Sequence, residues 1–116
     1  MITLYGIPNC DTVKKTMKWL TSQGIAYEFH NYKKMGLPPE KVDEWLQQVP
    51  FQKLVNKAGT TFRKLSDEQK AAANQLEGAK ELMLQQHSVI KRPIIEKDNQ
   101  LILIGFNEDE YNAAKF

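Results

Sequence analysis

The sequence predicts a mixed α/β fold in which helices cover a small sheet and a helical insertion interrupts the chain. Two observations predict this class. Residues 1–35 follow the order strand, helix, strand, and residues 88–116 follow the order strand, strand, helix. Residues 36–87 carry helical periodicity and helix-start signals instead. A chain of 116 residues is the size of a single domain, so we expect one domain over 1–116.

The first part of the chain reads as a βαβ unit. Residues 2–5 are rich in strand-forming side chains, and the turn cluster 6–9 closes them. A helix capped by Asp11 or Thr12 follows and ends at Gly24. Residues 25–32 alternate apolar and polar side chains, which predicts a second strand. The buried stripe of the helix is expected to consist of Val13, Met17 and Leu20.

The insertion opens with a helix that has proline in its first turn. Pro38 and Pro39 begin this helix and Pro50 ends it, because proline suits a first turn but cannot continue a helix. Residues 51–55 can form a further helical turn. Residues 56–65 are polar and rich in turn formers, so we expect an irregular segment there.

A capping signal starts the second half of the insertion. Ser66 followed by Gln69 is a capping box, which predicts a helix running toward Leu76. We expect Gly78 to break this helix, because glycine is unfavourable inside helices. A further helix is expected over 79–86.

The last part returns to strands. Residues 89–90 and 94–95 are short β-rich runs on either side of Lys91-Arg92-Pro93. Residues 98–99 are a turn signal, and residues 101–104 complete a hairpin. Asn107 can cap a final helix. This order corresponds to a thioredoxin-like arrangement, with a core over 1–35 and 88–116 and an insertion over 36–87.

Composition excludes several classes of protein. The net charge is only +2 and no basic run exceeds two residues, so we expect no nucleic-acid partner. The longest apolar run, residues 101–104, is far below the roughly 18 residues of a membrane span. Residues 1–5 look like a first strand, so we expect no signal peptide. A single Cys cannot form an internal disulfide. We therefore expect a cytoplasmic protein.

Cys10 is the sharpest candidate for chemistry. It lies between polar residues in the turn that joins the first strand to the first helix. Unpartnered N–H groups and the helix dipole stabilise an anion there, which favours a reactive thiolate. A buried, inert thiol is the alternative interpretation. Asn9 and the backbone amides after Cys10 can stabilise charge on a bound group.

Spacing excludes other cysteine sites. A dithiol motif needs a second Cys where Val13 stands, and a phosphatase loop needs Arg where Thr16 stands. Cys10, His30 and His87 are one ligand short of a zinc site, so no metal is expected.

Arginine is scarce in this chain. Of the 16 basic residues, only Arg63 and Arg92 are arginines. Guanidinium groups bind anions through a planar fork, which an ammonium cannot reproduce. Composition bias and exposed ion pairs are the alternatives. Pro93 follows Arg92, so their bond is one of the few kinds that adopt the cis form.

Three motifs together resemble a known family. The motifs are Leu4-Tyr5-Gly6-Ile7-Pro8-Asn9-Cys10-Asp11-Thr12, Gly59-Thr60-Thr61-Phe62-Arg63-Lys64-Leu65 and Ile90-Lys91-Arg92-Pro93. They occur in the order found in ArsC-type arsenate reductases, and they look most like the YffB-like subgroup. The resemblance implies a thioredoxin-like fold with Cys10 as nucleophile. It implies that Arg63 and Arg92, with Pro93 cis beside the site, bind an oxyanion. It also implies glutathione as co-substrate, possible transfer to glutaredoxin, and no bound cofactor.

Two positions depart from the arsenate reductases that the chain resembles. Gly6 stands where those enzymes carry a His, and Phe106-Asn107 stands where they carry a third Arg. Compared with those enzymes, both departures imply weaker anion binding and weaker activation of the thiol. We expect an oxidoreductase, arsenate reductase-like or a glutathione-dependent thiol reductase. The alternative is a regulatory, protein-binding module related to the Spx-like branch.

Overall fold

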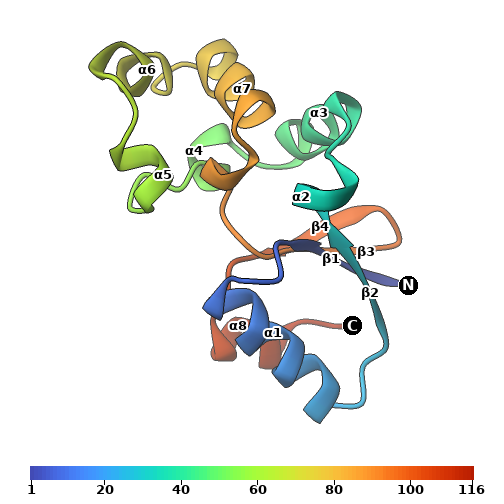
Figure 1. Cartoon of the computed structure of the whole chain (residues 1–116). Coiled ribbons are helices and arrows are strands. Elements are labelled where there is room, and N and C mark those ends of the chain that lie inside the picture. Colours follow the sequence, from blue (N-terminus) through green and yellow to red (C-terminus); the bar gives the residue numbers. More distant parts are fainter. The chain divides into compact units, whose positions relative to one another are not determined.

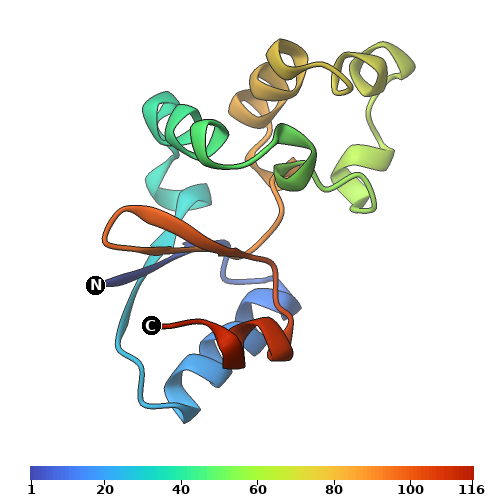
Figure 2. The same ribbon diagram turned by 180° about the vertical axis from the view of Figure 1, so that it is seen from behind.

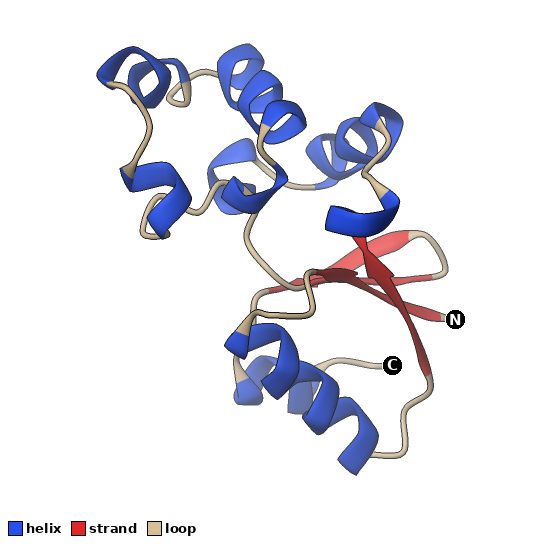
Figure 3. Cartoon of the chain, in the orientation of Figure 1, coloured by secondary structure: helices blue, strands red, loops and turns tan.

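The computed structural model describes all residues 1–116 and forms two compact units. One unit comprises Met1–Gly36 and Arg92–Phe116, and the other comprises Leu37–Lys91. The first unit carries the sheet, whereas the second is helical (Figure 3). The single domain expected over 1–116 stays a prediction.

The first unit is built on a four-stranded mixed sheet in the order β2-β1-β3-β4. Strand β1 pairs in parallel with β2 and antiparallel with β3, and β3 pairs antiparallel with β4. The strands are β1 (Ile2–Gly6), β2 (Tyr27–Asn31), β3 (Ile94–Lys97) and β4 (Gln100–Ile104). This confirms the predicted mixed α/β class and its βαβ … ββα order.

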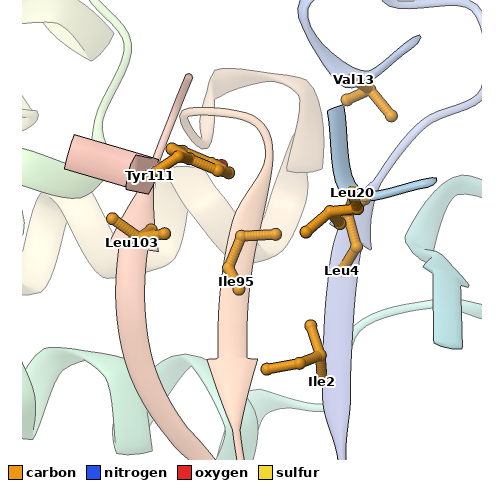
Figure 4. Packing of buried hydrophobic residues seen from close by; sticks show 7 residues of the cluster. All are labelled: Ile2, Leu4, Val13, Leu20, Ile95, Leu103 and Tyr111. Atoms are coloured by element: carbon orange, nitrogen blue, oxygen red, sulfur yellow. The ribbon is translucent and has the colours of Figure 1, made fainter. Parts of the chain in front are cut away.

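Helices α1 (Asp11–Ser22) and α8 (Glu108–Ala113) cover one face of this sheet (Figures 1 and 2). Their inward side chains meet every second residue of the strands, because successive strand side chains point to opposite faces. Burial of each large apolar side chain contributes roughly 1.5–3 kcal/mol as an upper estimate. The resulting core cluster consists of Ile2, Leu4, Val13, Leu20, Ile95, Leu103 and Tyr111 (Figure 4).

Local signals in the last part of the chain are confirmed. Asp98 and Asn99 adopt positive φ angles of 51° and 68°, as the tight turn of a β-hairpin requires. Asn107 caps α8, because its Oδ1 accepts a hydrogen bond of 3.0 Å from the backbone N–H of Glu110.

The second unit contains five α-helices and one 3₁₀ helix. The predicted start of α3 at Pro39 and the capping box of α6 are confirmed, with reciprocal bonds of 3.1 Å between Ser66 and Gln69. An ion pair of 2.6 Å joins Lys80 of α7 to Asp43 of α3. The elements are α3 (Pro39–Gln48), α4 (Phe51–Leu54), α5 (Thr60–Arg63), α6 (Asp67–Ala72), α7 (Leu76–Gln85) and η1 (His87–Val89).

The predicted helix break at Gly78 is wrong. Gly78 lies inside α7, and α6 already ends at Ala72. A Cβ atom at position 78 would stand 2.1 Å from the carbonyl oxygen of Ala72. Glycine is therefore needed here for the close contact of two helices and not for ending one.

Three other expectations need correction. Residues 89–90 do not form a strand, because Val89 ends η1 and Ile90 makes only an isolated bridge with Val55. Strand β2 ends at Asn31 and not at residue 32, because the Asn31 side chain caps the short helix α2 (Tyr32–Met35). The segment 56–65, expected to be irregular, contains α5. None of the helices has the length and apolar character needed to cross a bilayer.

Candidate functional site

Three segments of the first unit end or begin at the same end of its sheet. The loop after β1 and the helix after β2 leave from this end, because the two strands are parallel. The segment before β3 arrives there too, since β3 is antiparallel to β1 and Ile94 pairs with Tyr5. Sheet topology therefore gathers residues distant in sequence, namely Cys10, Tyr32 and Arg92.

Cys10 is the N-cap residue of α1. Its backbone is extended, with φ −114° and ψ 125°, and its carbonyl accepts the first helical bond, of 3.0 Å, from the N–H of Lys14. The side chain is half-buried. The thiol consequently lies at the positive end of a helix of 12 residues, where backbone N–H groups favour an anion.

The surroundings of Cys10 lower the pKa of its thiol. Burial alone raises this pKa. Hydrogen bonding to the backbone N–H of Val13, to the Arg92 side chain and to the backbone N–H of Thr12 lowers it, as does the charge of Arg92. The lowering effects prevail, so the thiolate is more populated at neutral pH than in an ordinary cysteine.

Arg92 reaches this site from the segment that precedes β3. Its bond to Pro93 is cis, as the resemblance implies. Pro93 is buried, and its carbonyl accepts a hydrogen bond of 2.8 Å from the N–H of Gly105 at the end of β4. The backbone at Arg92 is thus continuous with the sheet, while its half-buried side chain lies beside Cys10.

Tyr32 belongs to the same cluster and was missed by sequence reasoning. It is only 1% exposed. Its pKa is raised to about 12, mainly by burial and also by the charge of Cys10, whereas the charge and hydrogen bonding of Arg92 lower it. Tyr32 therefore interacts with both Arg92 and Cys10. The one sequence signal for it was Asn31, whose capping of α2 turns the chain out of the strand.

Gly6 permits the close contact between β1 and α1 that places Cys10. A Cβ atom at this position would lie 2.8 Å from Cγ2 of Val13. Any larger side chain, including the His expected in arsenate reductases, thus requires Val13 to move.

Phe106 and Asn107, where those enzymes carry a third Arg, have structural roles. Phe106 packs on Tyr111 with ring centroids 4.9 Å apart, and Asn107 caps α8.

Two further residues, Asn9 and Arg63, were predicted to bind the substrate. Asn9 is exposed in the turn before Cys10. Arg63 is the exposed last residue of α5 and belongs to the second unit. The binding roles of Asn9 and Arg63 stay predictions.

His30 is held by the fold. It shares a 2.8 Å hydrogen bond with the Gly36 carbonyl, and its ring centroid lies 4.8 Å from that of Tyr5. No three His, Cys, Asp or Glu side chains lie together as metal ligands would.

The family of the chain follows from sequence comparison. The model of the ArsC family matches residues 5–114, nearly the whole chain. The chain belongs to the ArsC family. Among its relatives, an uncharacterized protein of Haemophilus influenzae is 43% identical, with 98% of each chain covered. The global transcriptional regulator Spx of Streptococcus agalactiae is 33% identical, with 97% of this chain and 82% of the relative covered.

Solved structures of ArsC-family proteins share the fold. The YffB (PA3664) protein matches with a TM-score of 0.86 and 46% identity, covering 98% of both chains. An arsenate reductase (ArsC) related protein from Brucella melitensis matches with a TM-score of 0.79 and 48% identity, covering 97% of this chain and 92% of that one. These matches confirm the thioredoxin-like fold predicted from the sequence.

Proposed function

We propose that the protein is a glutathione-dependent thiol reductase related to arsenate reductases, with Cys10 as its single nucleophile. The observation that carries this proposal is the Cys10 thiol at the start of α1, whose pKa is lowered beside Arg92. A thiolate next to a fixed guanidinium is suited to attack an electrophile that carries an anionic group. Membership of the ArsC family supports the same reaction class.

The reaction that fits one cysteine is thiol–disulfide exchange with an external thiol. The Cys10 thiolate attacks the glutathione sulfur of a mixed disulfide, a new disulfide forms between Cys10 and glutathione, and the substrate thiolate leaves and takes up a proton. A second glutathione thiolate then attacks the glutathione sulfur on Cys10. This step releases glutathione disulfide and regenerates the Cys10 thiolate. Glutaredoxin can take the place of the second glutathione.

Substrate binding is assigned to the arginines. The forked guanidinium of Arg92, and that of Arg63, would bind glutathione carboxylates or an oxyanion, with Asn9 stabilising charge and Pro93 shaping the site. Arsenate is the other electrophile to test. This chain has Gly6 where arsenate reductases carry a His, and a side chain there would require Val13 to move, which favours a disulfide substrate. This chemistry requires a reducing compartment, so we place the protein in the cytoplasm.

A reduction assay tests the proposal directly. Purified protein is given glutathione with either a glutathione mixed disulfide or arsenate, and product formation is followed. We expect turnover by the wild type and none by Cys10→Ser, because a hydroxyl cannot form the covalent adduct. Ser22→Ala, at the opposite end of α1, is the matched control and should keep full activity. Equal turnover by Cys10→Ser would show that another group does the chemistry.

A regulatory module is the second candidate, and a specific finding favours it. A relative 33% identical over 97% of this chain is the global transcriptional regulator Spx. In such a role Cys10 would sense oxidation while the domain binds a larger protein. A stoichiometric partner that binds reduced and oxidised protein differently, together with no turnover in the assay above, would support this function over the first.

A further inference from the structure

The side of α1 that faces away from the sheet carries a cluster of positive charges. Lys14, Lys15 and Lys18 are exposed there, and none of the three forms an ion pair. Because an α-helix turns by about 100° per residue, these lysines fall within an arc of about 100°. Lys14 and Lys18 are like charges at positions i and i+4, which destabilises a helix, and the last turn, where a cation is favourable, holds no basic residue. The stability of the helix therefore does not explain this arrangement.

Two neighbouring hollows lie on the same side of α1. The larger, about 580 Å³, lies between α1 and the start of α8, and the smaller, about 420 Å³, lies along α1 (Figure 1). Lys18 and Ser22 line both, so the two are continuous. In the larger one the half-buried rings of Trp19 and Phe106 are exposed to a partner, and both pack on buried Tyr111, with centroid distances of 5.3 Å and 4.9 Å. The two hollows and the three lysines together are the α1 surface.

The chemistry of the α1 surface suits an acidic segment of another protein. Ammonium groups around an aromatic hollow attract carboxylates, while the rings contact apolar side chains. A nucleic acid or an anionic membrane would present its negative charge over a wide area. Glu108 lines the larger hollow, and Asp109 and Glu110 follow it in the first turn of α8. These carboxylates repel such a wide anionic surface, whereas a single chain segment can contact the lysines and avoid them.

The α1 surface begins one helical turn from the nucleophile, because the N–H of Lys14 donates a hydrogen bond of 3.0 Å to the carbonyl of Cys10. We propose that the α1 surface binds an acidic segment with apolar side chains in a protein substrate, and so brings a glutathionylated cysteine of that protein to Cys10. The Cys10 thiolate attacks the glutathione sulfur, the Cys10–glutathione disulfide forms, and the substrate thiolate leaves and takes up a proton. The substrate half of this inference rests on the proposed function, whereas the docking half does not.

Binding of synthetic peptides, measured by calorimetry, tests the docking half without any turnover. The acidic peptides place leucine, phenylalanine or tryptophan beside several glutamates and contain serine in place of cysteine, and in the control peptides lysines replace the glutamates. We expect the acidic peptides to bind, the control peptides not to bind, and the affinity to fall as salt is added. Absence of binding by the acidic peptides, or equal binding of both kinds, would overturn the proposal.

A charge reversal locates the binding on the α1 surface. Lys18→Glu, at a residue that lines both hollows, should weaken binding of the acidic peptides by about threefold or more. Lys53→Glu is the matched control, because it makes the same charge change at an exposed residue of α4 in the second unit, and it should leave the affinity unchanged. Both positions are exposed, and thermal unfolding verifies that both variants are folded. Equal weakening by the two variants would overturn the proposal.

Other occupants of the α1 surface are outcomes of the same set of experiments. Backbone amide resonances of residues 14–22 and 106–108 should shift on addition of the acidic peptides, and shifts confined to other residues would overturn the proposal. A dimer in sedimentation that Lys18→Glu dissociates would overturn it by assigning the surface to a second copy of this chain. Binding to phosphatidylserine vesicles that is tighter than binding to the peptides, and is lost in Lys18→Glu, would overturn it by assigning the surface to a membrane.

Turnover of glutathionylated peptides separates this inference from the proposed function. With a glutathionylated cysteine in place of the serine, kcat/KM should be about threefold or more higher for the acidic peptides than for the lysine peptides, and Lys18→Glu should remove this preference. Peptide binding without turnover of any mixed disulfide would refute the proposed function and keep the docking surface. Equal turnover of both kinds of peptide would keep the proposed function and overturn the docking of its substrate on α1.

Discussion

Gly6→Ala is the variant that most directly tests how the fold places Cys10. The added methyl group would stand 2.8 Å from Cγ2 of Val13, whereas ordinary van der Waals contact begins at 3.4 Å. Either Val13 and the first turn of α1 move outward, or the end of β1 does. Both movements disturb the Val13 N–H that favours the Cys10 thiolate, so the pKa of Cys10 should rise.

The expected loss of stability follows from two opposing effects. Forcing an extra carbon into a packed core costs about 1–3 kcal/mol. Replacing Gly by Ala restricts the unfolded chain, which stabilises the folded protein by about 0.4–1 kcal/mol. We therefore expect Gly6→Ala to lower the free energy of unfolding by about 1–2 kcal/mol.

The assay is urea unfolding of a double-mutant cycle with Val13→Ala. Val13→Ala removes both γ carbons and should cost about 2 kcal/mol by itself, since Val13 is fully buried. The loss of stability in the double variant should be smaller than the sum of the two single losses by about 1 kcal/mol or more, because Val13→Ala removes the atoms that the added methyl group would meet. If the losses add to within about 0.5 kcal/mol, the close contact is not what requires glycine at position 6.

Three other predictions concern the site and its supports. Arg92→Lys should weaken glutathione binding about tenfold, because an ammonium cannot replace a bidentate fork; unchanged affinity by calorimetry would remove Arg92 from the site. Asn107→Ala should lower the free energy of urea unfolding by about 1 kcal/mol through loss of the cap, while the exposed control Asn112→Ala should not. The free energy of unfolding of the wild type, relative to that of Cys10→Ser, should rise as the pH rises from the lowered pKa of folded Cys10 to the ordinary thiol value of about 8.5. In this pH range the folded thiol has lost its proton, while the unfolded chain still holds it. Parallel stability curves for the two proteins would contradict the last expectation.

Short-range features of this protein could be predicted from the sequence alone. The turn at Asp98 and Asn99 and the caps at Ser66 and Asn107 each depend on hydrogen bonds or backbone angles within a few residues. The position of Cys10 between the first strand and the first helix is of the same kind. Such features are determined locally, because the groups that form them are neighbours in the chain.

Only the tertiary structure decided what meets across longer distances. The segment at Gly78 reads as a break in sequence, yet the contact with Ala72 makes glycine necessary inside a helix. Tyr32 reads as one more strand residue, yet the parallel pairing of β1 and β2 and the antiparallel entry of β3 bring it to Arg92 and Cys10. Strand order and register set these neighbours, and both depend on the packing of the whole sheet and not on any single segment.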